Sequence, residues 1–291
     1  MSMLENTLPA GGEGGSVRVD AHHHLWKFDP VRESWITDEM LAIQKDFLPE
    51  NFNPILQRNG FDGSVVVQTD QSEAENEVLL NYANANHFIK GVVGWTDLQG
   101  KDVEDKLAAY ADSKTIKGFR HVLQGEEDRA LMLRSEFING ASKLAQFGFT
   151  YDILILADQL QYVREFVSAL PNQKFVVDHI AKPVIKNKEI AQWKKHVKDV
   201  AKNQNVWCKI SGMVTEADWK NWKQEDFVPY LDAVVEAFGT KRIMYGSDWP
   251  VCLLAASYES VLRIVEQYFA TFSEGERQLF FGENAIQFYN L

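Results

Sequence analysis

The chain has 291 residues, of which 45% are hydrophobic and 24% charged, a composition typical of a folded globular protein. Its formal net charge is -11, from 41 acidic and 30 basic residues, and the sequence shows no concentrated basic patch, which argues against nucleic acid as a partner. The apolar runs are far shorter than the roughly 20 residues that span a bilayer, so we expect no membrane partner.

Residues 1–16 are rich in glycine and lack the basic start and apolar stretch of a signal peptide. We therefore predict a flexible leader over 1–16 and one domain over 17–291. The two cysteines, Cys208 and Cys252, belong to no Cys-x-x-Cys pair and cannot form a disulfide framework, which favours a cytoplasmic location. The oligomeric state stays open, a homo-oligomer included.

From residue 17 onward, short β-rich runs alternate with longer helical patterns. The expected strands cover 17–22, 63–68, 89–95, 116–121, 150–155, 174–179, 206–210 and 242–246. The expected helices cover 73–86, 103–112, 128–147, 159–170, 189–203 and 227–238, with two more after the last strand. Eight βα units in about 250 residues predict an α/β fold of the (β/α)8 barrel type, with an open doubly wound sheet as the alternative.

The first expected strand ends in three consecutive histidines rather than in the glycines of a dinucleotide-binding fold. The period of two along a strand puts His22 and His24 on one face and His23 on the other. The long segment 28–51 that follows is predicted to roof the barrel mouth. Because reactive groups of such barrels lie at the carboxyl ends of the strands, we interpret His22 and His24 as metal ligands or substrate donors rather than as packing residues.

Two further expected strands end in groups that suit hydrolysis. Asp248 follows the last strand, which neighbours the first in a closed barrel, so its carboxylate faces the histidines and is suited to bind a metal or to accept a proton from water. The alternative is a turn or helix-capping aspartate before Pro250. His179 ends the sixth strand and is suited to ligate a metal or to donate to a carbonyl oxygen, with Asp178 orienting it; a structural histidine is the alternative.

The remaining candidates lie at other strand ends and in the first loop. Arg120 closes the fourth strand and offers a fork of donors to a carbonyl or carboxylate oxygen. A salt bridge at the barrel mouth, for example between Arg120 and Asp152, is the alternative. We expect further substrate contacts from side chains at or near the strand ends, namely Trp26, Tyr151, Lys182, Lys209 and Trp249.

As a set, these motifs resemble the amidohydrolase superfamily. They are Asp-Ala-His-x-His-Leu-Trp, Gly-Phe-Arg-His, Asp-His-x-x-Lys-Pro, Lys-Ile-Ser-Gly-Met-Val-Thr-Glu and Tyr-Gly-Ser-Asp-Trp-Pro, and the likeness extends over residues 17–291. More narrowly, the chain is similar to the lactonase branch, which includes L-fucono-lactonases, L-rhamnono-lactonases, sulfomuconolactone hydrolases and pyrone-dicarboxylate lactonases.

The resemblance implies a TIM barrel and a metal set of His22, His24 and Asp248, with His179 as the fourth ligand. Many members of the superfamily also have a histidine on the fifth strand and a carboxylated lysine on the fourth, whereas this chain has Tyr151 and Asp152 on the fifth and Arg120 on the fourth. The two alternatives are therefore one divalent ion such as zinc and a metal-independent site.

The resemblance and the residues together predict a hydrolase that opens a sugar-acid lactone, such as an L-fucono- or L-rhamnono-lactone. The predicted catalytic residues are Asp248 as general base, with His179 and Arg120 polarising the carbonyl group. Three alternatives are a metal-dependent decarboxylase of the same superfamily, a hydrolase of dicarboxylate lactones, and a barrel that binds a sugar acid without turnover.

Overall fold

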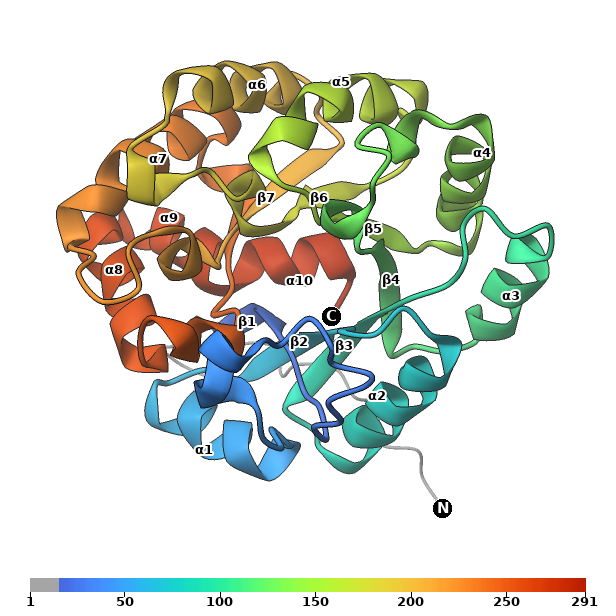
Figure 1. The fold of residues 1–291 in the computed structure, drawn as a ribbon, viewed down its shortest axis with the longest axis horizontal. Helices are drawn as coiled ribbons and strands as arrows, with labels where there is room; N and C mark the ends of the chain where they lie inside the picture. Colours follow the sequence, from blue (N-terminus) through green and yellow to red (C-terminus); the bar gives the residue numbers. More distant parts are fainter. Residues whose placement is uncertain (1–15) are drawn as a thin grey trace.

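The computed structural model describes residues 16–291, in which eight strands and ten α-helices follow one another along the chain (Figure 1). The strands are β1 (Val19–His23), β2 (Gly63–Val67), β3 (Ile89–Gly94), β4 (Ile116–His121), β5 (Thr150–Ile153), β6 (Phe175–Val177), β7 (Val206–Ile210) and β8 (Ile243–Tyr245). The helices are α1 (Pro49–Arg58), α2 (Glu73–Ala85), α3 (Val103–Tyr110), α4 (Ser135–Leu144), α5 (Leu160–Ala169), α6 (Ala191–Ala201), α7 (Gln224–Phe238), α8 (Tyr258–Phe269), α9 (Glu274–Gln278) and α10 (Asn284–Tyr289).

Each strand pairs in parallel with the next, in the order β1 to β8, which confirms the predicted single-domain (β/α)8 barrel. Two strands, β4 and β7, have the predicted bounds, and each of the other six is one to three residues shorter than predicted. The predicted helix over 128–147 is shorter than expected, and α1 begins at Pro49, inside the predicted first loop. Among residues 16–291, every helix is too short or too polar to cross a bilayer.

The predicted leader lies outside the described residues except for Ser16, so its boundary with the barrel stays a prediction.

The interior of the barrel is apolar at the amino ends of the strands. Alternate residues of β2, Val65 and Val67, face this interior, whereas Val66 packs against the surrounding helices. Helix α10 crosses the barrel in Figure 1 and inserts Phe288 and Tyr289 into the same interior cluster. One end of the barrel is therefore filled, and the opposite end is left for polar groups.

The barrel closes between β8 and β1 through few contacts, which lie at the carboxyl ends of the strands. A single bridge joins His23 and Trp249. The amide of Asp248 donates to the carbonyl oxygen of His22 at 2.9 Å, and the amide of His24 donates to that of Trp249 at 2.7 Å. The backbone on both sides of this seam carries the candidate site residues, so closing the barrel also sets their separation.

The packing of α4 against the loop after β3 leaves no room for a side chain at Gly140. A Cβ atom built at this position would lie 1.8 Å from the carbonyl oxygen of Leu98, a backbone atom. We expect Gly140→Ala to lower the free energy of unfolding by about 3 kcal/mol, because helix and loop must separate. Urea denaturation followed by circular dichroism measures this change.

Gly275→Ala in α9 is the matched control, because a Cβ there meets no atom within 4 Å. Alanine favours a helix over glycine by about 1 kcal/mol, so the control should be unchanged or slightly more stable. Equal unfolding midpoints for the two variants would contradict the tight contact at Gly140.

Candidate functional site

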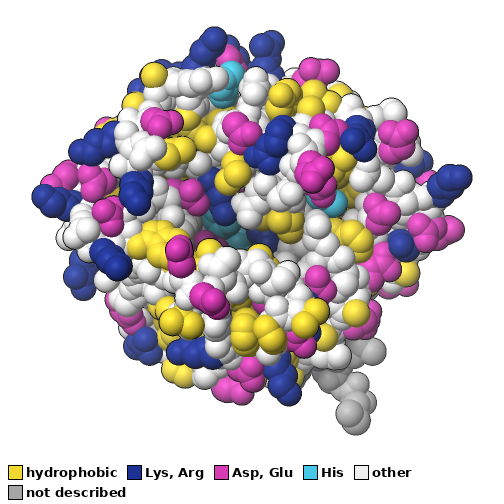
Figure 2. Space-filling view, in the orientation of Figure 1, with side chains coloured by type: hydrophobic (Ala, Val, Ile, Leu, Met, Phe, Trp, Pro, Cys, Tyr) yellow, Lys and Arg dark blue, Asp and Glu magenta, His cyan; other side chains and the backbone are white. Residues whose placement is uncertain are grey.

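A cavity of about 370 Å³ opens at the carboxyl ends of the strands. Figure 2 looks into this end of the barrel and shows histidine and basic side chains at the bottom of a central hollow. The predicted site residues that line the cavity are His24, Arg120, His179, Lys182 and Asp248. The rest of the wall comes from loops after the strands and consists of Arg32, Trp35, Thr69, Asp70, Gln71, Val122, Gln124, Gly125, Leu154 and Val251.

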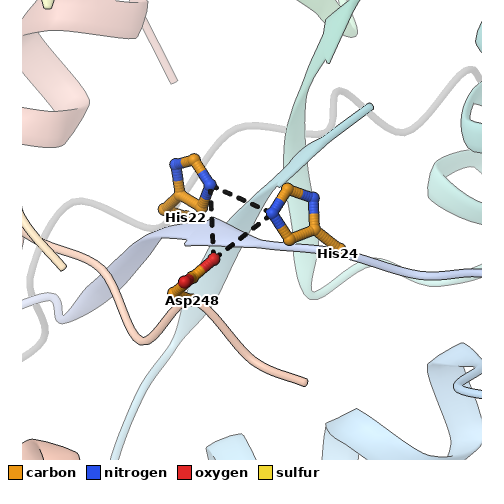
Figure 3. A group of neighbouring side chains, drawn as sticks. All are labelled: His22, His24 and Asp248. Carbon is orange, nitrogen blue, oxygen red and sulfur yellow. Dashed lines mark hydrogen bonds and ion pairs between the residues drawn. The ribbon is translucent and has the colours of Figure 1, made fainter. Parts of the chain in front are cut away.

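Three imidazoles surround the carboxylate of Asp248 (Figure 3 draws two of them). Asp248 Oδ1 lies 3.4 Å from His24 Nε2, 3.8 Å from His22 Nε2 and 3.9 Å from His179 Nε2. The Nε2 atoms of His22 and His24 are 3.2 Å apart. His23 turns away, and its ring stacks on Phe52 with centroids 4.2 Å apart. The three consecutive histidines thus divide between the two faces of β1, as the period of two predicts.

The electrostatics of the site favour a charged carboxylate among neutral rings. Burial alone would raise the pKa of Asp248, but the imidazoles of His179 and His24 outweigh it and hold this pKa below its ordinary value. Burial lowers the pKa of His24 and, more strongly, that of His179. His24 Nδ1 lies 2.8 Å from the carbonyl oxygen of Val67, which can only accept, so Nδ1 of His24 carries a proton and donates it there.

Lys209 lies beneath the cavity with its side chain fully buried, and three groups surround its ammonium. Its Nζ is 2.6 Å from Asp152 Oδ2, 3.1 Å from Asp178 Oδ1 and 3.0 Å from His22 Nδ1. The hydroxyl of Tyr289, from α10, donates to the same Asp152 oxygen at 2.7 Å. A chain of contacts therefore runs from the filled end of the barrel to the imidazole of His22.

Arg120 lines the cavity but already has protein acceptors for every nitrogen of its guanidinium group. Its Nη1 donates to Asp178 Oδ2 at 3.1 Å, and its Nε and Nη2 donate to Gln68 Oε1 at 3.0 and 2.8 Å. The alternative partner Asp152 is bound to Lys209 instead. Burial would raise the pKa of Asp178, but Lys209 and Arg120 outweigh it and lower this pKa. Arg120 thus brings positive charge to the cavity while its donors stay engaged.

His179 and Lys182 lie on an unusual turn after β6. Residues 179–182 all have left-handed backbone conformations, with φ of 54°, 49°, 59° and 45°, although none is glycine. This conformation costs roughly 1–2 kcal/mol for each L-residue, so the surrounding structure must hold it. Gly212, itself left-handed at φ 60°, leaves space for the ring, since a Cβ there would lie 2.7 Å from His179 Nδ1.

The orientation of His179 comes from a residue of a quoted motif to which the sequence analysis assigned no role. Ser211 Oγ lies 2.8 Å from His179 Nδ1, whereas the Asp178 oxygens face Arg120 and Lys209. The expectation that Asp178 orients His179 by a direct contact is therefore corrected. The position of Ser211, directly after β7, was the available signal, because strand ends meet at this edge.

Four of the predicted substrate contacts, together with His22, do not line the cavity. Tyr151 is fully buried among Phe137, Phe166 and Phe175, on the outer face of β5, because its neighbour Asp152 takes the inner face. This placement does not support Tyr151 as a substrate contact.

The other three are also held by protein groups. Trp26 donates from its indole to the carbonyl oxygen of Lys45 and packs on Phe47, and Trp249 stacks on Phe52. Lys209 is enclosed beneath His22 as described above. The apolar part of the cavity wall is formed by Trp35, from the predicted roof loop, with Leu154 and Val251, and includes neither Trp26 nor Trp249.

The donor set fits a divalent metal ion. Ligand atoms of His22, His24 and Asp248 lie within 4.8 Å of one another, and two imidazoles with a carboxylate are donors that zinc accepts. The buried Asp178 Oδ1, which also meets the Lys209 ammonium at 3.1 Å, lies 3.4 Å from His22 Nδ1, where a carboxylate commonly orients a metal-binding histidine. Against tight binding, Arg120 Nη1 is 3.4 Å from His22 Nε2, so a cation already lies beside one ligand atom.

Comparison with known proteins assigns the chain to a family. The model of the family described as "Amidohydrolase" matches residues 19–291. An L-fucono-1,5-lactonase of Burkholderia multivorans is 34% identical over 288 residues, covering 95% of this chain and 97% of the relative. An L-fucono-1,5-lactonase of Burkholderia ambifaria is 32% identical over 281 residues, covering 94% and 96%.

A solved structure agrees with this assignment. The crystal structure of an amidohydrolase from Burkholderia multivorans with bound zinc superposes with a TM-score of 0.91 at 34% identity, covering 95% of this chain and 100% of that one. The family match and the superposition both cover nearly the whole chain, from the first strand of the barrel to its last helix. This protein belongs to the amidohydrolase family.

Proposed function

We propose that this protein hydrolyses the lactone of a sugar acid with a water molecule that Asp248 activates. One observation carries the proposal: an ionised carboxylate lies 3.4 and 3.9 Å from the imidazoles of His24 and His179, in a cavity of about 370 Å³ at the barrel mouth. The activity named for the two Burkholderia relatives belongs to the same class and supports it.

Opening a lactone requires a base for the attacking water, positive charge or donors at the carbonyl oxygen, and a proton for the ring oxygen. Asp248 accepts the proton as the water oxygen attacks the carbonyl carbon. His179 Nε2 and the ammonium of Lys182 face the cavity and donate to the carbonyl oxygen, while Arg120 adds positive charge. The bond between the carbonyl carbon and the ring oxygen then breaks, and the proton on Asp248 passes to the ring oxygen. The product is a hydroxy acid, which becomes its carboxylate by releasing the second proton of the water to solvent.

His22, His24 and Asp248 are the residues that would hold a divalent ion such as zinc, with His179 nearest as a further donor. A bound ion would supply a Lewis acid for the carbonyl oxygen and lower the pKa of water.

The cavity wall favours a neutral, hydroxylated ring. Gln71 and Gln124 offer amide groups for hydroxyls, and Trp35 offers an apolar surface for a ring face. Two carboxylates of the wall, Asp70 and Asp248, oppose an anionic substrate. We place this activity in the cytoplasm, because Cys208 and Cys252 are both buried free thiols.

Asp248→Asn should lower kcat/KM by about 10²- to 10⁴-fold, because the amide keeps the shape of the side chain but cannot take a proton. The measurement is the initial rate of acid release from an L-fucono- or L-rhamnono-lactone in a pH-stat. Asp112→Asn, an exposed change at the opposite end of the barrel, is the control. If Asp248→Asn keeps more than half of the wild-type kcat/KM, Asp248 is not the base.

Dialysis against a chelator should lower kcat/KM far less than Asp248→Asn does. The guanidinium of Arg120 lies 3.4 Å from Nε2 of His22, one of the three close ligands, so a divalent cation bound there would meet a like charge. Elemental analysis and activity before and after dialysis provide the test. Stoichiometric zinc whose removal abolishes lactone turnover would contradict weak binding. Tight zinc in a protein that opens no lactone would favour the decarboxylase alternative.

A neutral sugar-acid lactone should be hydrolysed with a kcat/KM at least about 100-fold above that for a pyrone-dicarboxylate, or roughly 2.7 kcal/mol in transition-state binding. The wall cations Arg120 and Arg32 are paired with Asp178 and Glu33, so two carboxylates would lack bidentate partners. Side-by-side assays with both lactones measure the ratio. Equal turnover of the dicarboxylate would overturn the preference, and binding without turnover of any lactone would favour the non-enzymatic alternative.

A further inference from the structure

The left-handed turn after β6 brings two side chains to the same side of the backbone. The amide of Lys182 donates to the carbonyl oxygen of His179 at 2.8 Å, which closes a turn of three residues. In a turn of this length, the side chains three positions apart project from the same side. His179 and Lys182 accordingly both line the cavity, while Ile180 and Ala181 between them are buried.

A tryptophan outside the cavity holds this turn. The indole Nε1 of Trp193, on α6, donates to the carbonyl oxygen of Ile180 at 2.8 Å, and both groups are buried. The Trp193 ring packs on Tyr230 of α7, with centroids 5.3 Å apart, so the donor is fixed by two helices. Without it, a buried carbonyl oxygen in a strained turn would lose this partner, which favours relaxation of the turn.

The turn carries Lys182, whose ammonium is the positive charge of the described cavity wall that is most available to a ligand. Among the cations of the described cavity wall, Arg120 contacts Asp178 at 3.1 Å and Arg32 contacts Glu33 at 2.6 Å. Lys182 has its carboxylate partner, Glu216, only at 4.0 Å. A shift of the turn would therefore move the cation best able to meet the negative charge that develops on the carbonyl oxygen and stays on the carboxylate product.

We propose that Trp193 is a positioning residue for the reaction: its indole N–H fixes the left-handed turn and thereby aims His179 and Lys182 together at the substrate. This inference rests on the proposed lactone hydrolysis for its catalytic consequence. The placement of the turn by Trp193 is a separate claim that can be measured without any substrate.

The variant is Trp193→Phe, which removes the donor, and the matched control is Trp222→Phe. The indole of Trp222 also donates to a backbone carbonyl oxygen, that of Ala255 at 2.9 Å, but it does not touch the turn. Hydrogen exchange of a peptide covering residues 178–184 should be at least tenfold faster in Trp193→Phe and unchanged in Trp222→Phe. Unchanged exchange in Trp193→Phe would overturn the proposal.

Kinetics with whichever L-fucono- or L-rhamnono-lactone the wild type hydrolyses faster provide the second measurement. We expect Trp193→Phe to lower kcat/KM about tenfold, mainly through kcat, and to weaken inhibition by the open acid, with neither effect in Trp222→Phe. In a Lys182→Met background, Trp193→Phe should cost clearly less than in the wild type, because the two changes act on the same contact. Fully additive losses, or equal losses in the control, would show that Trp193 acts only on stability.

Two outcomes distinguish the proposed lactone hydrolysis from the placement of the turn by Trp193. If the wild type opens no lactone while exchange at the turn responds as expected, the proposed function fails and the placement of the turn by Trp193 stands. If Trp193→Phe does not fold, benzothienylalanine at position 193 keeps both rings and lacks the N–H, and the same substitution at 222 is its control. Exchange and kinetics like those of the wild type in that variant would overturn the proposal.

Discussion

A charge enclosed in a β-barrel needs an opposite charge within hydrogen-bonding distance, because leaving water costs several kcal/mol for each ion. Here the constraint centres on Lys209, whose buried ammonium lies between Asp152 and Asp178. Arg120 binds the second oxygen of Asp178. Side chains from β4, β5 and β7 and the residue after β6 thus fix one another, and His22 from β1 rests on the same ammonium. The buried charges at the floor of the site therefore balance one another, with Gln68 and Tyr289 as additional neutral partners.

The seam of the barrel adds the remaining half of the site. Because β1 and β8 share so few backbone contacts, the side chain of Asp20 contributes to the closure. Its Oδ1 accepts from the amide of His22 at 3.2 Å and from the amide of Ser247 at 2.9 Å. The contacts that close the barrel therefore also hold Asp248 against the histidines of β1, and a change that loosens the seam moves the base relative to the substrate. The same contacts therefore determine both the closure of the barrel and the geometry of the site.

Periodicity explains which parts of this arrangement the sequence predicts. The period of two separates His22 and His24 from His23, and the count of βα units predicts the neighbourhood of Asp248 and β1. The same period, applied to β5, also excludes Tyr151 from the interior once Asp152 is placed there. The expectation that Tyr151 contacts substrate overlooked this, because a strand end was treated as if both of its last residues could face inward.

The sequence does not predict which partner a charged side chain binds when several opposite charges lie within its reach. Arg120 and Asp152 are direct neighbours in the register of β4 and β5, yet Arg120 binds Asp178 because Lys209 occupies Asp152. The left-handed turn over residues 179–182 is also hidden, since the sequence His-Ile-Ala-Lys contains no glycine to mark a positive φ. Only the three-dimensional packing around Gly212 and Trp193 accounts for it.

The reach of α10 into the barrel has a consequence for how the chain is made. Asp152 receives the hydroxyl of Tyr289 across a sequence separation of 137 residues. At typical ribosomal speeds, this distance corresponds to roughly 7–27 s of synthesis. During that interval the strands already made can pair locally, but the interior carboxylate still lacks one of its partners and the barrel floor lacks its apolar cover. The final packing of the barrel interior therefore awaits α10, a helix that is synthesised after all eight strands.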